Sequence, residues 1–411
     1  MSHSERKARL EALLLGFQTL WRPQPFKIET PDWCTEHPGL SAELLALDDA
    51  AVDRLSPDNE ALIGLLGRHI PELEELARLI DLPPASRASP HPLEDGGRLF
   101  TDVPGRKQSQ IVAYAAAFGP PRAPVLEWCA GKGHLGRLLA QRWHWPVASL
   151  EIDPALCEAG EDLARRAQVD CMQHFVRADA LAAGSARHLA GRHAVALHAC
   201  GDLHTRLIGA AAANASPAVD LAPCCYYRTA NETYRPFAET ALTLSRDDLH
   251  LAVTETATAS AKQQRQSRQA QAWKLAWVEL RKSLTGETGY TPFPPVPEAW
   301  LRCSFGEFID HMLERAGLVM PAQAGIQPNA TGLPPARERR DLFAHLEAIG
   351  HARATRMRRL QLARLAFRRP LEVWLLMDMA AFLERHGYTV TVGPFCGPEL
   401  TPRNLLLSAR R

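Results

Sequence analysis

The chain lacks any long apolar run. In its 411 residues we find no stretch near the roughly 18 apolar residues that a membrane span requires. The first nine residues, Met-Ser-His-Ser-Glu-Arg-Lys-Ala-Arg, also lack the apolar centre of a secretory signal peptide. We therefore expect a cytoplasmic protein that has no membrane partner.

Net charge and a disulfide framework are also missing. The 47 lysine and arginine residues almost cancel the 46 acidic residues, so the charge of the whole chain gives no argument for a polyanionic partner. The nine cysteines are odd in number and contain no C-x-x-C pair, which favours reduced thiols. A composition of 46% hydrophobic and 23% charged residues is typical of a soluble globular protein, and this length suits two domains.

Hydrophobic periodicity divides the chain into four segments. Residues 1–95 form a helical N-terminal region, with apolar residues at helical spacing from Leu10 to Phe17 and again through Ala61–Ile80, and prolines mark a linker near 82–95. Residues 96–236 are the core. Residues 237–370 are a helical, basic insertion that contains an aperiodic segment at 318–336. Residues 371–411 supply a helix and two closing strands to the core.

The core segment alternates short apolar runs with helical stretches. This alternation predicts an α/β fold with a Rossmann-like parallel sheet, and ligands bind such sheets beyond the carboxyl ends of the strands. The predicted strands are Val125–Trp128, Val147–Ile152, Phe175–Ala178, Ala194–His198, Val219–Pro223, Tyr388–Val392 and Asn404–Ala409.

A glycine-rich turn follows the first of these strands. Gly131, Gly133 and Gly136 satisfy the G-x-G-x-x-G pattern between a strand and a helix predicted over Arg137–Arg142. Glycines let a ligand approach the backbone, and a helix start offers free N–H groups. The turn therefore indicates a site for a nucleotide-like cofactor.

Three carboxylates narrow the choice of cofactor. Glu127 is placed within the turn, where it could face a cationic group; there it would oppose the pyrophosphate of a nicotinamide dinucleotide and so argues against that cofactor. Glu151 ends the second strand and could accept both hydroxyls of a ribose. Asp179 follows the third strand and could accept from an adenine amino group. The alternative for Glu151 and Asp179 is a role as helix caps. Together the three predict a site for adenosine with a short, positively charged tail.

Two further motifs lie at the ends of the fourth and fifth strands. They are Leu197-His198-Ala-Cys200-Gly201-Asp202 and Pro223-Cys224-Cys225-Tyr226-Tyr227. With these motifs, residues 100–230 and 371–411 resemble the class I S-adenosylmethionine-dependent methyltransferases. The resemblance is closest to the subgroup with His-x-Cys-Gly and Cys-Cys motifs, which includes the methyltransferase-like-25 proteins and a tRNA 2′-O-methyltransferase. This chain departs from the tRNA enzyme in having tyrosines after the cysteine pair and leucine before His198.

The resemblance implies a set of binding residues. The turn, comprising Ala130, Gly131, Gly133 and Gly136, would hold the methionine part of S-adenosylmethionine. Glu151 would bind the ribose, and Asp179 with Ala180 the adenine. Lys107 falls in the basic segment that precedes the first strand in this family.

The residues beyond the fourth and fifth strands are candidates for catalysis and acceptor binding. If the acceptor is a ribose hydroxyl, Lys107, His198 or Asp202 would receive its proton. Tyr226 and Tyr227 would stack on a base or, alternatively, pack the sheet edge. Cys200, Cys224 and Cys225 are assigned to the acceptor pocket, and no metal is predicted. A thiolate metal site and a nucleophilic cysteine are alternatives, but free cysteine is usually a small buried apolar residue.

Local basicity suggests RNA as the methyl acceptor, and the resemblance implies tRNA among RNAs. Two segments carry it, 262–282, where basic residues alternate with Trp273 and Trp277, and the arginine-rich 337–369. The alternative is a solvated face over a packed core. Other possible functions are methylation of a protein or small molecule, and non-catalytic binding of S-adenosylmethionine. The arginines are Arg337, Arg339, Arg340, Arg353, Arg356, Arg358, Arg359, Arg364, Arg368 and Arg369.

Overall fold

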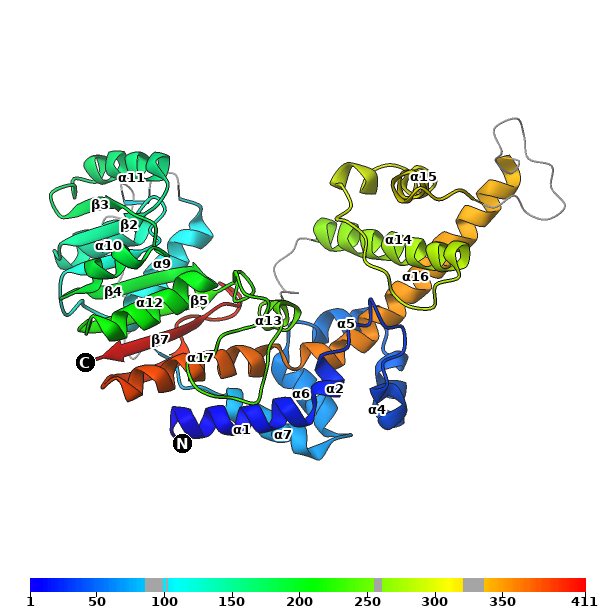
Figure 1. Ribbon diagram of the computed structural model, residues 1–411, viewed down its shortest axis with the longest axis horizontal. Helices are drawn as coiled ribbons and strands as arrows, with labels where there is room; N and C mark the ends of the chain where they lie inside the picture. The colour runs from blue at the N-terminus through cyan, green and yellow to red at the C-terminus, as the bar shows by residue number, and fades with distance from the viewer. Residues whose placement is uncertain (86–98, 101–102, 255–260, 321–335) are drawn as a thin grey trace. The chain divides into compact units, whose positions relative to one another are not determined.

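A computed structural model describes residues 1–85, 99–100, 103–254, 261–320 and 336–411 (Figure 1). Most of the predicted linker at 82–95, most of the aperiodic segment at 318–336 and the side chain of Arg337 lie outside the described residues. The chain forms two compact units. The first comprises Met1–Gly16, Glu72–Glu255 and Phe367–Arg411, and the second comprises Phe17–Pro71 and Thr256–Ala366. In the described part of the chain, no helix combines the length and apolarity needed to cross a bilayer.

The first unit is built on a seven-stranded sheet with the order β3-β2-β1-β4-β5-β7-β6. Strands β1 to β5 are parallel, and β7 runs antiparallel to both β5 and β6. The α/β prediction is confirmed, and each predicted strand lies within two residues of an observed one. The strands are β1 (Val125–Trp128), β2 (Val147–Glu151), β3 (Gln173–Arg177), β4 (His193–Cys200), β5 (Ala218–Cys224), β6 (Thr389–Pro394) and β7 (Leu405–Arg410).

Helices cover this sheet. Helices α9, α10 and α11 bury side chains such as Tyr114, Leu138 and Ala164 in one cluster with Val125 and Val195 of the strands. Helices α12 and α17 pack against each other and against strands β4 to β7 (Figure 1). The helices of the unit are α1 (His3–Gly16), α7 (Glu74–Ile80), α9 (Gly105–Phe118), α10 (His134–Trp143), α11 (Pro154–Arg166), the 3-10 helix η2 (Ala183–Leu189), α12 (Asp202–Ala213), α13 (Arg246–Ala252) and α17 (Arg368–Arg385).

The strand order reverses at β1, which has β2 on one side and β4 on the other. Helices that leave neighbouring strands at such a point diverge, so a crevice opens at the carboxyl ends. The glycine turn, Glu151 and the His198–Asp202 motif all follow strands at this edge. The topology therefore brings the predicted site residues together at the carboxyl ends of the strands.

The helical pattern through Ala61–Ile80 corresponds to two helices. Helix α6 ends at Gly67 and α7 begins at Glu74 after a short 3-10 turn, η1 (Pro71–Leu73), because Pro71 cannot donate a backbone hydrogen bond. Helix α1 contacts α7 and α17 within the sheet unit. There Lys7 pairs with the fully buried Asp378 at 2.9 Å.

The second unit is helical. Its core contains Trp273 and Trp277 of α14 with Phe308 of α15. Helices α14 and α16 meet at Gly350, where an added Cβ would contact Ala276 and clash with backbone of α14. The segment 286–297, expected to be helical, is irregular because it carries four prolines. The helices are α2 (Gln18–Trp21), α3 (Trp33–Glu36), α4 (Pro38–Ala46), α5 (Asp49–Leu55), α6 (Asn59–Gly67), α14 (Ala261–Thr285), η3 (Glu298–Leu301), α15 (Phe305–Ala316) and α16 (Ala336–Leu365).

Candidate functional site

The turn between β1 and α10 has one glycine that is open to a ligand. Gly131 has a φ of +58°, and an added Cβ would find no atom within 4 Å. Its backbone is therefore approachable from that side, and a side chain there would be strained by about 1–2 kcal/mol. Helix α10 begins at His134, three residues earlier than predicted, with Gly133 as its left-handed N-cap.

The other two glycines of the motif face the protein interior. At Gly133, which also has a positive φ of +63°, an added Cβ would contact the ring of Phe175 at 2.6 Å. At Gly136 it would lie 2.5 Å from Glu127 Oε2 and 2.9 Å from Ser149 Oγ. These glycines let helix α10 pack closely against β2 and β3, whereas contact with the methionine part of the cofactor remains a prediction for all three.

Glu127 lies in strand β1 and not in the turn, because the strand extends to Trp128 before the chain turns. Its side chain is buried and accepts a 2.7 Å hydrogen bond from Ser149 Oγ. Gln173 in turn donates to Ser149 Oγ at 2.8 Å and to the Gly133 carbonyl at 2.9 Å. Burial raises the pKa of Glu127 to about 7, although the hydrogen bonds from Ser149 and the Gly136 N–H oppose this rise. The carboxyl group is thus connected to the Gly133 carbonyl of the turn through Ser149 and Gln173.

Glu151 joins the turn to the end of β2. Its Oε2 accepts from the N–H of Gly131 at 2.8 Å, and its Oε1 accepts from the N–H groups of Ile152 and Asp153 at 2.9 and 3.1 Å. Asp153, rather than Glu151, caps helix α11. Among the described residues, Oε2 of Glu151 accepts only the one hydrogen bond from Gly131 and has a second lone pair, so Glu151 can also accept from a ligand hydroxyl.

Asp179 lies beyond β3, on the same edge of the sheet. It is exposed, and its Oδ1 accepts from the N–H of Leu181 at 2.8 Å, which orders the turn rather than capping η2. Asp179 and Glu151 both raise the pKa of the Cys129 thiol, after the larger effect of burial, to about 12. Both carboxylates therefore lie within electrostatic range of the turn. Of the remaining predicted contacts, Ala130 is half-buried and Ala180 is buried.

His198 interrupts strand β4. Its φ of +61° coincides with a register irregularity between Leu197 and Ala199. Gln110 Nε2 donates to the Leu400 carbonyl at 3.0 Å, so its Oε1 faces His198 Nε2 at 3.3 Å. This arrangement assigns the proton to Nε2. Nδ1 is buried and has no hydrogen-bond partner among the described residues. Burial, followed by Arg403 and Lys107, lowers the pKa of His198 to about 4, so the ring is neutral at pH 7.

The other predicted catalytic residues have different surroundings. Lys107 is exposed on the first turn of α9. Asp202 begins α12 and accepts a 2.8 Å hydrogen bond from the N–H of Ala230. Next to it, Gly201 has a φ of +52°, and an added Cβ would clash with the Arg228 carbonyl. The Cys-Gly-Asp sequence thus holds the loop that follows β5.

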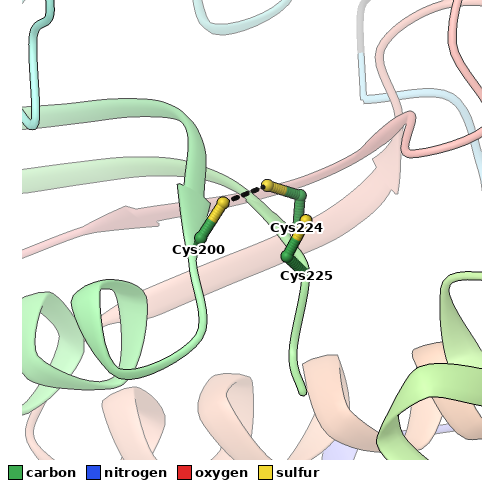
Figure 2. Close-up of side chains that lie close together, drawn as sticks. All are labelled: Cys200, Cys224 and Cys225. Atoms are coloured by element: carbon green, nitrogen blue, oxygen red, sulfur yellow. Dashed lines mark hydrogen bonds between the residues drawn. The ribbon is translucent and has the colours of Figure 1, made fainter. Parts of the chain in front are cut away.

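The two tyrosines after β5 differ in burial and in their neighbours. Tyr226 is buried, with its ring 5.1 Å from His204 in an edge-on arrangement, which favours the packing interpretation. Tyr227 is half-buried and lies against His250 at 4.8 Å. The three cysteines of the motifs, Cys200, Cys224 and Cys225, lie together at the ends of β4 and β5 (Figure 2).

The arginines of α16 do not form an open basic face. Arg353 is buried and pairs with Glu279, and Arg358 pairs with Asp53 at 2.7 Å. Arg364 is also buried and donates to backbone carbonyls. The cause is the position of α16, which contacts α2, α4, α5, α6, α14 and α15 within its unit. Trp273 and Trp277 are buried core residues, as the packed-core interpretation of the 262–282 segment requires. An RNA partner stays a prediction, but these paired or buried arginines provide few free charges for RNA phosphates.

Three supporting residues were not predicted. Gln110 orients His198, while Ser149 and Gln173 connect Glu127 to the turn. Only proximity in the fold reveals these roles. The one available signal was Ser149, a polar residue inside the predicted strand Val147–Ile152, because a buried polar group requires a partner.

The site region has recognisable relatives. Residues 107–232 match a protein family described as a methyltransferase domain. No curated protein matches the chain. Among solved structures, it is similar to geranyl diphosphate C-methyltransferase from Streptomyces coelicolor A3(2), with 14% identity and a TM-score of 0.25 over 34% of this chain and 56% of that one. It is also similar to the 23S rRNA methyltransferase ErmE, with 23% identity and a TM-score of 0.22 over 28% of this chain and 44% of that one. The chain thus covers about half of each structure, and TM-scores this low carry no argument about function.

Proposed function

We propose that the protein transfers a methyl group from S-adenosylmethionine to RNA. The proposal is supported by the match of residues 107–232 to a methyltransferase-domain family and by the α/β sheet on which they lie. S-adenosylmethionine is the cofactor of methyltransferases with this fold. Transfer RNA is the first acceptor to test, since the sequence motifs resemble those of a tRNA 2′-O-methyltransferase.

The observation that carries the cofactor assignment is the junction of Gly131 and Glu151. The approachable backbone of Gly131 and the carboxylate of Glu151 are held together by a 2.8 Å hydrogen bond, and Asp179 lies at the next strand end. The residues fit an adenosyl ligand, because Oε2 of Glu151 has a lone pair left for a ribose hydroxyl and Asp179 is exposed to accept from an amino group. When bound, S-adenosylmethionine supplies a methyl group on a sulfonium that is already a good leaving group.

The work left to the protein is alignment of the acceptor and exclusion of water. His198 suits the first task. Its neutral ring is fixed by Gln110, and the buried Nδ1 can accept a hydrogen bond from an O–H or N–H of the acceptor. Asp202 keeps the adjoining loop in place through Ala230 and therefore acts as a positioning residue in this proposal.

The support for an anionic acceptor comes from the rim of the site rather than from α16. Lys107, Lys132 and Arg228 are exposed at the edge where the strands end. Lys107 and Lys132 contribute to the depressed pKa of His134, and Arg228 contributes to that of Cys200, so these cations lie near the site. Phosphate groups of RNA would be attracted to such a rim.

The first experiment tests transfer and acceptor class together. The full chain is incubated with methyl-labelled S-adenosylmethionine and with RNA, protein and small-molecule fractions of a cell extract. We expect label in RNA. Label in protein or small molecules would overturn the RNA assignment and leave methyl transfer standing. Binding of S-adenosylmethionine without transfer to any fraction would reduce the protein to a non-catalytic binding module.

A second experiment tests the site. Glu151→Ala should weaken S-adenosylmethionine binding about 10- to 100-fold in calorimetry, the effect of losing charge-assisted hydrogen bonds. Glu158→Ala, on the exposed side of α11, is the matched control and should bind normally. Equal affinities of the two variants would contradict the ribose assignment.

A third experiment tests the cationic rim. Lys132→Gln and Arg228→Gln should each weaken RNA binding and reduce its salt dependence by about one charge, whereas Arg122→Gln, at the exposed amino end of β1, should do neither. Binding that does not change with salt would contradict phosphate recognition.

A further inference from the structure

Three thiols that are separate in the sequence meet at one point of the sheet. Cys200 ends β4, Cys224 ends β5, and the two residues are paired in the register of these parallel strands. Their Sγ atoms are 3.1 Å apart, and Sγ of Cys225 lies within 4.8 Å of both (Figure 2). The cluster lies on strand ends, which are among the most rigid places in such a fold.

The backbone departs from regular geometry to make this cluster. In a strand, successive side chains point to opposite faces, so Cys225 would point away from Cys200 if β5 simply continued. Instead Cys225 has a φ of +42°, a conformation that costs a non-glycine residue on the order of 1–2 kcal/mol. The irregularity at His198 likewise shifts the pairing of β4 just before Cys200. Such strain is retained where a function requires it.

The spacing of the sulfur atoms suits a zinc ion. With Zn–S bonds of about 2.3 Å, the sulfurs of a tetrahedral site are roughly 3.8 Å apart. The three thiols are within that range after small side-chain rotations. Zinc binds cysteine as the thiolate, so the ion displaces the thiol protons as it binds.

The nearby positive charges and the partial exposure of the thiols also suit a zinc ion. One Zn²⁺ with three thiolates carries a net charge of −1, which Arg228 and Arg403 would balance. Among the described residues, no histidine, aspartate, glutamate or further cysteine joins the group. Cys200 and Cys225 are partly exposed, so a molecule from solvent can reach the fourth position. Three protein ligands and one open position are typical of catalytic rather than structural zinc sites.

We propose that Cys200, Cys224 and Cys225 bind one Zn²⁺ ion whose fourth coordination position is open to water or to an acceptor group. The proposal replaces the assignment of these cysteines as simple pocket residues. It does not depend on methyl transfer, since an ion can be bound whatever the enzyme methylates. The main rival is a disulfide between Cys200 and Cys224, for which the two sulfurs are also close.

The test uses the full chain, produced with zinc in the medium and purified under reducing conditions without chelator. Elemental analysis should find about one zinc per chain. Cys200→Ser, Cys224→Ser and Cys225→Ser should each weaken zinc binding by at least roughly 100-fold, more than the loss of an outer-shell partner. Cys171→Ser, at an exposed cysteine of the same unit, should retain the ion. Retention of zinc by all three site variants would overturn the proposal.

A second measurement avoids variants that fail to fold. Wild-type protein is alkylated with and without micromolar Zn²⁺, and each cysteine is quantified by mass spectrometry. Zinc should slow modification of Cys200 and Cys225 at least tenfold and leave Cys171 unchanged. Absence of both bound zinc and protection would overturn the proposal, as would a Cys200–Cys224 disulfide in protein isolated without reductant.

Discussion

Replacement of Glu127 by glutamine should change how the stability of the sheet unit depends on pH. The carboxyl group is buried in β1, and its pKa is raised from 4.5 to about 7, chiefly because burial disfavours the charged form. Glutamine has the same shape and can still accept from Ser149, but it does not titrate. The variant therefore isolates the cost of ionising a buried carboxyl group beneath the glycine turn.

The sign and size of the effect follow from linkage. Because the folded pKa lies above the unfolded one, the protonated carboxyl group stabilises the protein fully below pH 4.5, and this contribution is lost as the pH rises to about 7. At about 1.4 kcal/mol per pKa unit, the loss is about 3 kcal/mol. We therefore compare the unfolding free energy of the sheet unit in Glu127→Gln with that in wild type. This difference should shift in favour of the variant by about 2 to 3 kcal/mol between pH 5 and pH 8.

The assay must report on the sheet unit alone, since two compact units need not unfold in one step. Hydrogen exchange of the β1 and β2 amides, followed by mass spectrometry, meets this need. Wild type and variant are compared at each pH, which removes the intrinsic pH dependence of exchange. Glu158→Gln, on the surface of α11, is the control. A difference between Glu127→Gln and wild type that stays constant from pH 5 to pH 8 would refute the reasoning.

Three further predictions concern two glycines of the turn and a buried ion pair. Gly136→Ala should destabilise the sheet unit by about 1–3 kcal/mol in exchange experiments, because its Cβ would crowd the buried Glu127 and Ser149; a neutral result would contradict the packing role of this glycine. Gly131→Ala, with open space around it, should cost only its backbone strain of about 1–2 kcal/mol but should weaken S-adenosylmethionine binding in calorimetry, and unchanged binding would place the cofactor elsewhere. Asp220→Asn should destabilise the sheet unit by about 3–5 kcal/mol in the same exchange experiments, because the buried carboxylate pairs with Arg410 at 2.9 Å and its loss leaves that guanidinium without an acidic partner; a small change would show that solvent replaces the pair.

Much of the fold was readable from local pattern. Short, mostly apolar runs such as Val125–Trp128 and Val219–Pro223 predicted the strands, because strands buried on both faces are rich in apolar residues. Each of these two runs also contains one buried acid, Glu127 or Asp220. The glycine turn was equally visible, since only glycine adopts the required conformations without cost. Pro71 was visible too, and it marks where the helical pattern through Ala61–Ile80 divides between α6 and α7.

The α/β class, the seven strands and the residues at their carboxyl ends could be predicted from sequence, because strand, helix and turn preferences are local properties of the chain. Which glycine faces a ligand, the burial of Glu127, and the neutralisation of the α16 arginines by acidic residues and backbone carbonyls of their own unit depend on contacts between distant residues and became visible only in the fold. The same holds for the thiol cluster. Cys200 and Cys224 meet because of the register between β4 and β5, and Cys225 joins them through one left-handed residue, and no local pattern encodes either arrangement.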